Sequence, residues 1–442
     1  MKILLIISNN LFYRNYLNRY VLEDLKKYAE VKILGNKVDA NDSKNLFDFE
    51  CGESKVNSFL HWVIASISLF SNRNLTKSFQ MRVRRRFYPY IEDSITVRKI
   101  LKYIKKSLIL IFFILITKFK FVTSFLIFIL KKFLKINKSF AHIIKTEKPD
   151  LVLIPTNGFF SFELDIECTL HKLKQKYISL IDNWDNLSSK NILMYKANHY
   201  GVWGEQNKII AEQIQKINRN DTTCLGTPRF EVYKKLKVNK IFDFKYILFV
   251  GSSNRYNEYG VLQLLNKIII KNKIDFKVIY RPHPWRDNSD FPDLSVLNKI
   301  VLDPQMKTQY ENKARSDNFQ PDIDYYNDIL SNCEFVIGSL TSMLIEALVK
   351  KKKYIALIHS EPGFKYSPSE WYKGYTNFDE LKSLKNLILL NDLDKLEKTL
   401  FNLIEVDNIF IDDEFLSYFI TFDEEPYSKK LIKMINNLKN SD

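Results

Sequence analysis

The chain has 442 residues, of which 46% are hydrophobic and 14% aromatic, so it can bury a large core and is not a disordered protein. Its four cysteines lie far apart without a C-x-x-C pair, which argues against a zinc ribbon or a secreted disulfide framework and favours a reducing cytosol. The net charge of +16 raises the possibility of nucleic-acid binding, but the distribution of the charge argues against it.

The first predicted element is a buried strand at residues 2–8. The N-terminal run MKILLIIS has too few apolar residues for a spanning helix and no small-residue cleavage site for a signal peptide. A second strand is predicted at residues 30–34. We therefore expect the chain to begin inside its own fold.

Positive charge is concentrated in one segment, residues 82–138. This segment has fifteen Lys or Arg residues against two acids, Glu92 and Asp93, so the rest of the chain carries only about three net positive charges. The basic residues alternate with the most apolar stretch of the chain, and not with aromatic residues arranged to stack on bases. The segment therefore fits an anionic membrane surface better than a nucleic acid.

Within this segment, residues 108–130 raise the question of a membrane span. Eighteen of them are Leu, Ile, Phe or Val, but Lys118 and Lys120 lie near the middle, so insertion energies alone do not decide. A single span would separate the first two strands from the later strands with which they should pair. We therefore predict two shorter helices, broken near these lysines, that lie in the membrane interface or form a hairpin. The alternative is a pair of core helices whose lysines reach solvent.

The rest of the chain alternates short apolar strands with helical stretches, which predicts parallel sheets covered by helices. The charged run 234–243 has the composition of a loop, and a second domain is expected after it. The elements expected before this loop are strands at 151–155, 177–181 and 200–203 and a helix at 209–217. Those expected after it are strands at 246–250, 276–280, 335–338 and 354–358 and helices at 260–270, 342–349 and 427–438. Two such halves predict an α/β protein with a ligand cleft between domains.

A histidine turn with the sequence RPHPWR follows the strand at 276–280. Each proline restricts its own backbone and that of the preceding residue, so His283 is held in one direction. Arg281 and Arg286 flank it, and guanidinium groups bind phosphate bidentately while imidazole adds one directed donor. The turn therefore predicts a phosphate contact. The alternative is a proline-rich surface turn whose histidine forms local hydrogen bonds.

A hydroxyl-rich turn, GSLTSMLIEAL, follows the strand at 335–338. Ser339, Thr341 and Ser342 lie between the strand end and the start of a helix, where backbone amides and the helix dipole favour an anion. Glu346, one turn further, could reach a ribose diol. The stretch predicts a phosphate cradle, and the alternative is an ordinary helix N-cap with Glu346 as its capping-box partner.

Together these two turns resemble the paired HP and S/T motifs of GT-B glycosyltransferases that build bacterial surface polysaccharides, among them sialyltransferases and Kdo transferases. They are also similar to motifs of the CDP-glycerol glycerophosphotransferases of teichoic acid synthesis. The resemblance covers about residues 177–360 and implies a GT-B fold, in which two Rossmann-like domains face a cleft. It implies that His283 and the three hydroxyls hold the donor phosphate, that Glu346 contacts the ribose, and that no metal is needed.

An acidic turn, IDNWDNLSSK, follows a predicted strand of the first half. Asp182 and Asp185 flank Trp184, which could form the floor of a sugar site with Asn186 beside it. A base that deprotonates an acceptor hydroxyl is expected opposite the donor phosphate, so either aspartate is a candidate. Similar stretches occur in surface-carbohydrate transferases. The alternative is an Asx-turn that leads into a capped helix.

Other polar stretches carry weaker signals. Ser252 and Ser253 could touch donor or acceptor, but their turn lacks the G-x-G-x-x-G of dinucleotide sites. The turn at 225–230 is expected to be structural. Asp322 and Asp324 imitate the D-x-D of metal-dependent transferases but precede a helical stretch, where a capping role is expected. The six histidines are scattered, so no metal site is predicted.

These observations predict a cytoplasmic glycosyltransferase on the inner face of the plasma membrane. Residues 1–240 would form the acceptor-side domain with a membrane-associating insertion at about 82–138, residues 241–425 the nucleotide-donor domain, and residues 426–442 a helix that packs back on the first domain. The expected partners are a nucleotide-sugar donor, a glycan or lipid-linked acceptor and an anionic membrane surface, with no nucleic acid and no cofactor. The rival hypotheses are a CDP-polyol phosphotransferase of the teichoic-acid type, a nucleotide-sugar 2-epimerase, and a non-catalytic assembly factor.

Overall fold

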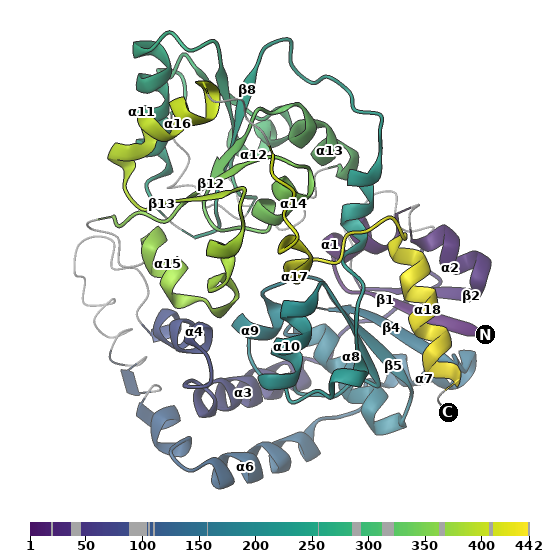
Figure 1. Ribbon diagram of the computed structural model, residues 1–442. Helices are drawn as coiled ribbons and strands as arrows, with labels where there is room; N and C mark the ends of the chain where they lie inside the picture. Colours follow the sequence, from purple (N-terminus) through teal and green to yellow (C-terminus); the bar gives the residue numbers. More distant parts are fainter. Residues whose placement is uncertain are drawn as a thin grey trace. The chain divides into compact units, whose positions relative to one another are not determined.

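The computed structural model describes the chain apart from residues 19–20, 37–45, 88–103, 105–106, 109–110, 157, 255, 285–292, 312–321, 362–366, 406–409 and 441–442. The chain forms two compact units. Unit 1 comprises Met1–Pro228, Gly374–Asn377 and Tyr418–Asp442, and unit 2 comprises Arg229–Lys373 and Phe378–Ser417. Each unit is built around one β-sheet (Figure 1).

The sheet of unit 1 has seven strands in the described residues, and all neighbouring strands are parallel. In spatial order they are β3 (Phe49–Glu50), β2 (Glu30–Gly35), β1 (Lys2–Ile7), β4 (Leu151–Thr156), β5 (Tyr177–Ile181), β6 (His199–Val202) and β7 (Thr222–Cys224). The N-terminal strand β1 therefore lies between β2 and β4, inside the sheet.

Helices cover both faces of this sheet. The labelled helices of unit 1 are α1 (Asn10–Tyr16), α2 (Leu22–Tyr28), α3 (Lys55–Ser71), α4 (Lys77–Phe87), α6 (Lys120–Phe133), α7 (Lys138–Glu147), α8 (Ser161–Leu173), α9 (Asn186–Ser189), α10 (Glu205–Gln213) and α18 (Tyr427–Asn440), of which α4 and α6 pack on other helices. Ile3, Leu5 and Ile7 of β1 pack with α1, α2 and α18. Leu4 and Ile6 pack with α7 and α8, because successive side chains of a strand point to opposite faces.

The basic apolar segment forms separate helices, as predicted. Residues 111–116 are helical, the chain turns at 117–119, and α6 begins at Lys120. Leu126, Ile127 and Leu130 of α6 pack against α3. Within the described ranges, no helix combines the length and the apolar character that crossing a membrane requires.

The sheet of unit 2 is also parallel, with six strands in the residues that the structure describes. In spatial order they are β10 (Ile300–Leu302), β9 (Lys277–Arg281), β8 (Tyr246–Val250), β11 (Val336–Gly338), β12 (Tyr354–Leu357) and β13 (Leu387–Leu390). The chain winds outward from β8 in one direction and then from β11 in the other, which is the strand order of a doubly wound Rossmann sheet. The predicted fold class, α/β with two Rossmann-like sheets, is confirmed.

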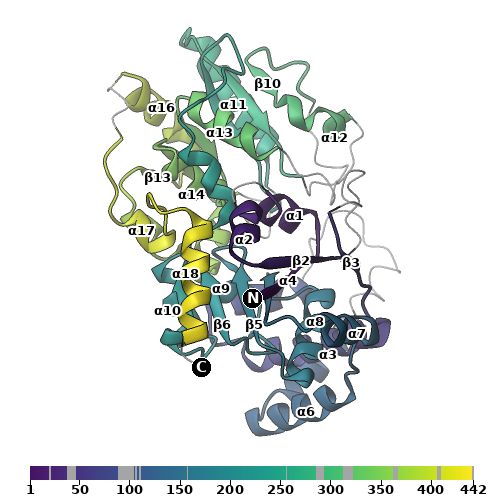
Figure 2. The same ribbon diagram turned by 90° about the vertical axis from the view of Figure 1, so that its right-hand side faces the viewer.

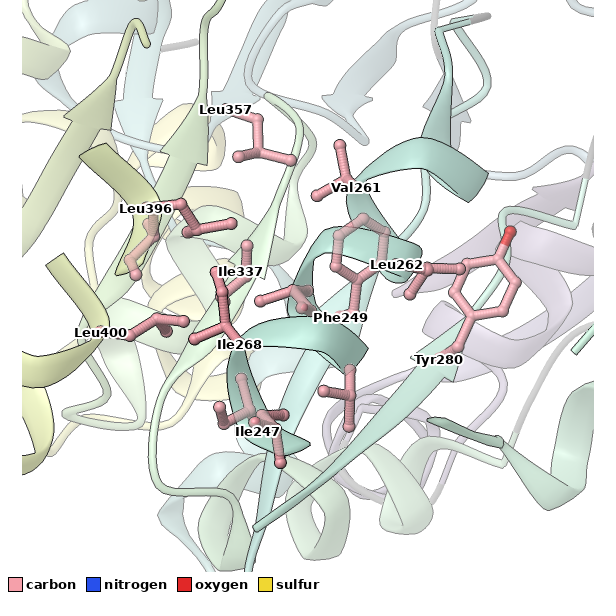
Figure 3. Packing of buried hydrophobic residues seen from close by; sticks show 14 of the residues in the cluster. Ile247, Phe249, Val261, Leu262, Ile268, Tyr280, Ile337, Leu357, Leu396 and Leu400 are labelled. Carbon is pink, nitrogen blue, oxygen red and sulfur yellow. The ribbon is translucent and has the colours of Figure 1, made fainter. Parts of the chain in front are cut away.

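The core of unit 2 lies between its sheet and two long helices (Figure 3). The helices in this part of the chain are α11 (Glu258–Lys271), α12 (Lys307–Glu311), α13 (Ile323–Asn332), α14 (Met343–Val349), α15 (Pro368–Gly374), α16 (Leu396–Glu405) and α17 (Leu416–Phe419). Ile247 and Phe249 of β8 and Ile337 of β11 point toward Ile268 of α11 and Leu400 of α16. This apolar layer fixes the strands whose ends are described below.

Two helix starts show how local sequence sets the boundaries. The helix predicted at 209–217 begins earlier, at Glu205, because Gly204 occupies the N-cap position; it ends at Gln213, shortly before Lys216, which has a φ of 55°. The D-x-D pair has the predicted capping role, since the Asp322 side chain accepts a hydrogen bond of 3.0 Å from the Asp324 amide at the start of α13.

Candidate functional site

Three neighbouring strands of unit 2 end at the same level. Val250 of β8 is paired with Arg281 of β9 on one side and with Gly338 of β11 on the other. The histidine turn, the turn after β8 and the hydroxyl-rich turn therefore leave the sheet side by side. The winding direction reverses between β8 and β11, and open α/β sheets bind ligands at such a switch point, beyond the carboxyl ends of the strands.

Gly251 brings the turn after β8 against the histidine turn. Its amide donates a hydrogen bond of 2.8 Å to the Arg281 carbonyl. A Cβ atom at Gly251 would lie 2.9 Å from a Glu258 carboxylate oxygen, 3.0 Å from the His283 nitrogen and 3.1 Å from the Pro282 Cα. These contacts are closer than side chains normally make, so glycine at this position lets half-buried His283 lie beside the end of β8.

Glu258, which the sequence analysis did not single out, organises these turns. It is buried in the first turn of α11. One carboxylate oxygen accepts a hydrogen bond of 2.9 Å from the Ser252 amide, and the other accepts one of 2.8 Å from the Tyr280 hydroxyl. Ser252 is buried and its hydroxyl accepts from the Asn254 amide, whereas Ser253 is exposed.

Arg281 lies inside unit 2. Its guanidinium forms a buried ion pair with Asp303 and lies 4.6 Å from the centre of the Tyr326 ring. The Tyr325 hydroxyl donates a hydrogen bond of 2.8 Å to the same aspartate. Asp303 therefore balances the positive charge of Arg281, which was expected to bind a phosphate. In this arrangement Arg281 supports the end of β9. Arg286, the second arginine of the turn, lies outside the described residues.

The hydroxyl-rich turn follows β11 directly. Ser339 is buried, and its carbonyl accepts a hydrogen bond of 2.6 Å from the Tyr354 hydroxyl. Ser342 occupies the N-cap position of α14, but its side chain makes no capping hydrogen bond. Thr341 and Ser342 are half-buried beside the strand ends. Because Ser342 does not cap α14, the capping-box alternative predicted for this turn is not the arrangement observed.

Glu346 is held by two residues of the segment that opens unit 2. Arg229 Nη2 lies 3.3 Å from its carboxylate, and the Tyr233 hydroxyl donates a hydrogen bond to it. Both come from the 3-10 helix Pro228–Lys234. Burial raises the pKa of Tyr233 well above its ordinary value, and the adjacent carboxylate adds to the rise. If Glu346 contacts a ribose, it therefore does so while it is also held by Arg229 and Tyr233.

The acidic turn of unit 1 follows β5. Asp182 is buried and accepts a hydrogen bond of 3.0 Å from Asn15 Nδ2. Trp184 is also buried, with its ring centre 5.8 Å from that of Phe419, so the indole packs in the core instead of presenting an open face to a sugar. Asn186 is buried at the start of α9. The first part of the turn is thus mainly structural.

Asp185 is the more accessible of the two aspartates. Its side chain is 24% exposed and accepts a hydrogen bond of 2.7 Å from the Ser189 hydroxyl. Lys190 Nζ lies 4.0 Å from the same carboxylate oxygen. A general base must meet solvent or substrate, so Asp185 fits that role better than Asp182.

A metal centre is not apparent in the part of the chain that the structure describes. There, no group of three or more His, Cys, Asp or Glu side chains is arranged to hold an ion.

Comparisons with known proteins identify the fold. No family model matches the chain, and no curated protein does. A Listeria monocytogenes protein described as a UDP-N-acetylglucosamine 2-epimerase matches with a TM-score of 0.55 and 11% identity, over 100% of this chain and 96% of that one. The Neisseria meningitidis UDP-GlcNAc 2-epimerase, solved with UDP-GlcNAc bound, matches with a TM-score of 0.54 and 12% identity over 100% of both chains.

A third solved structure gives the same result. The UDP-GlcNAc 2-epimerase from Methanocaldococcus jannaschii matches with a TM-score of 0.50 and 12% identity, over 99% of this chain and 100% of that one. At such identities the likeness concerns the fold alone. The chain thus shares a GT-B-like fold of two parallel Rossmann-like sheets with these three proteins.

Proposed function

We propose that this chain is an enzyme that binds a nucleotide sugar through unit 2. The observation that carries the proposal is that β9, β8 and β11 end at the same level. The turn after β8, where Gly251 approaches the His283 turn, lies between that turn and the hydroxyl-rich turn after β11. An imidazole, hydroxyls and backbone amides are suitable donors for phosphate oxygens. A solved protein of the same fold was obtained with UDP-GlcNAc bound, which supports this class of ligand.

The reaction that we propose is transfer of the sugar to a surface-glycan acceptor, which is lipid-linked and lies at the cytoplasmic face of the plasma membrane. The acceptor oxygen forms a bond to the anomeric carbon, and the bond from that carbon to the phosphate oxygen breaks. Asp185 takes the proton of the acceptor hydroxyl. The electron pair stays on the phosphate, where His283 and the hydroxyls of Thr341 and Ser342 stabilise the growing negative charge.

A nucleotide-sugar 2-epimerase is the second candidate. It is favoured by the comparisons, since three solved proteins bearing that name match this chain over at least 99% of its length. An epimerase needs the same donor site but no acceptor. The two candidates therefore differ in what must be added for turnover.

Nucleotide binding is tested by thermal shift with CMP, CDP, UDP and GDP. A ligand at about a hundredfold its dissociation constant stabilises the folded state by roughly 2.7 kcal/mol. We expect one nucleotide to raise the Tm of the wild type and His283→Ala to remove the shift. His142→Ala, at an exposed histidine of unit 1, is the matched control and should keep it. If no nucleotide raises the Tm, the proposed function is wrong.

The two reactions are separated by incubating the enzyme with UDP-GlcNAc alone in deuterated water. An epimerase exchanges the proton at C2 for deuterium, which NMR detects. A transferase leaves C2 unlabelled and releases the nucleotide only when an acceptor is supplied. Deuterium at C2 would exclude the transferase candidate for this donor.

A further inference from the structure

Exposed apolar side chains are concentrated on three helical segments of unit 1. These segments are the first half of α3, the separate helical run at residues 111–116, and α6. α6 runs beside α3 in both views (Figures 1 and 2). The exposed large hydrophobic residues on them are Val56, Phe59, Trp62, Ile111, Phe112, Ile114, Leu115, Phe121, Val122, Phe125, Phe128 and Phe133. We call this set the apolar face. Single exposed hydrophobic residues are normal, but a cluster of this size marks an interaction surface.

α6 has two different apolar sides. Leu126, Ile127 and Leu130 are partly buried and pack against core clusters that include residues of α3. Phe121, Phe125 and Phe128, spaced by four and three residues, are 83%, 57% and 56% exposed. Side chains at this spacing lie on one stripe of a helix. Packing inside unit 1 therefore accounts for only one side of the helix.

α3 extends the same surface. Phe59 and Trp62 are exposed, and their rings stack with centres 6.2 Å apart. They neighbour Leu60 and Val63, which pack with residues of α6, so the aromatic pair lies along the edge of the α3–α6 contact. Tryptophan is enriched where a protein meets the interface between lipid and water.

The charge on the α6 side of the apolar face is positive. Lys118, Lys120 and Lys132 are exposed, and Lys132 Nζ lies 4.6 Å from the centre of the Phe128 ring. The sequence has no Asp or Glu between residues 94 and 146. Lysines with long apolar stems can keep their charge at lipid headgroups while neighbouring rings enter the bilayer.

We propose that the apolar face docks on an anionic lipid surface, with Phe59, Trp62 and the outer phenylalanines of α6 in the interface and the lysines at the headgroups. A second copy of this chain is a poorer occupant, because a symmetric contact of this face with itself would bring lysines against lysines. Anionic headgroups supply the missing opposite charge. The proposal rests on the proposed function only in that a lipid-linked acceptor would lie on the same surface.

The test is co-sedimentation of the full chain with vesicles of phosphatidylcholine alone or of phosphatidylcholine with phosphatidylglycerol. We expect binding to the anionic vesicles that weakens as salt is added. Phe121→Ser/Phe125→Ser/Phe128→Ser should lower the partition coefficient by about tenfold or more. The matched control is Ile270→Ser/Val296→Ser/Ile411→Ser, which changes three exposed residues of unit 2 and should bind like the wild type. Lys118→Glu/Lys120→Glu tests the charge without removing apolar surface and should also weaken binding.

Each other outcome is decisive. Equal binding to both vesicle types, or undiminished binding by both face variants, would overturn the proposal. So would a wild-type dimer in light scattering that the triple phenylalanine variant converts to a monomer, since a second copy would then cover the face. The nucleotide thermal shift should be unchanged in the face variants. Vesicle binding without any nucleotide shift would refute the proposed function and leave the docking face standing.

Discussion

At the scale of single residues, burial fixes the charge state of side chains that support the apolar face. His61 of α3 is buried, with the centre of its ring 6.1 Å from that of Tyr195, and neither ring nitrogen has a hydrogen-bond partner among the described residues. Burial lowers the pKa of His61 to about 4, and the positive charge of Lys131 adds to the effect. The imidazole is therefore neutral in the folded protein over the physiological range.

This neutrality predicts acid sensitivity. The pKa of His61 is lower in the folded than in the unfolded chain, so between pH 6.5 and 4 the unfolded state binds the extra proton and stability falls as the pH falls. Between pH 7 and pH 5 the free energy of unfolding should fall by about 2 kcal/mol more in the wild type than in His61→Phe. Urea unfolding curves at the two pH values measure this difference. His142→Phe, at an exposed site, should leave the loss unchanged; an equal loss in wild type and His61→Phe would contradict the prediction.

Asp185 gives a kinetic prediction at the same scale. Asp185→Asn keeps the shape of the turn but removes the basic carboxylate, so we expect kcat to fall by about a hundredfold or more. The nucleotide thermal shift should stay as in the wild type, because unit 2 is unchanged. Asp182→Asn is the comparison, since that carboxylate is buried against Asn15. Loss of turnover in Asp182→Asn alone would transfer the role of base to Asp182.

Sequence reasoning selected the residues of the histidine and hydroxyl turns as candidates but did not reveal the side chains that support them. Arg281 was assigned to a phosphate because nothing local indicates Asp303, which lies on a different strand end. Glu258 looks like any acidic residue in a first helical turn, and only the adjacency of β8 and β9 explains its burial. Partners distant in sequence become visible only once the strand order is known.

At the scale of elements, the burial of a strand also determines whether it can be predicted from the sequence. Among the described residues, the nine interior strands of the two sheets were all predicted, since strands buried on both faces read as continuous apolar runs. The four strands that were not predicted, β3, β7, β10 and β13, are the edges of the two sheets. They are two to four residues long and partly exposed, so their sequences carry little pattern.

The contact between the turns after β8 and β9 gives an element-scale prediction. Gly251→Ala places a methyl group 2.9 Å from a Glu258 carboxylate oxygen and 3.0 Å from the His283 nitrogen, so the carboxylate and the histidine turn have to shift. We expect a stability loss of about 1–3 kcal/mol, as for overpacking, together with weaker nucleotide binding. Isothermal titration with the nucleotide identified by thermal shift measures the affinity. Gly52→Ala, which meets no atom within 4 Å, is the control; unchanged affinity in Gly251→Ala would separate this contact from the donor site.

At the scale of the whole molecule, unit 1 is assembled from segments that lie far apart in the chain. Unit 1 is completed by Tyr418–Asp442, and α18 buries Tyr427, Leu431, Met434 and Ile435 in the same core as β1. The Ser428 hydroxyl donates a hydrogen bond of 2.6 Å to Asp24 on α2. The last described helix is therefore part of the first core.

This arrangement predicts strong effects of changes near the C-terminus. Leu431→Ala should lower the free energy of unfolding by about 2–5 kcal/mol, because it leaves a cavity in a core that also holds the N-terminal strand. Lys429→Ala, on the exposed side of α18, should change it by less than about 0.5 kcal/mol. Denaturant unfolding followed by circular dichroism provides the measurement, and equal midpoints for the two variants would show that α18 is dispensable.

The place of α18 also has a consequence for synthesis on the ribosome. Unit 2 has all its segments once Ser417 has emerged, whereas the core of unit 1, although begun by β1, lacks α18 until Tyr427–Asn440 has also emerged. The unit that starts first is therefore completed last. During that interval the β1 face that α18 covers is open, and nascent chains with open apolar surface are the ones that chaperones bind.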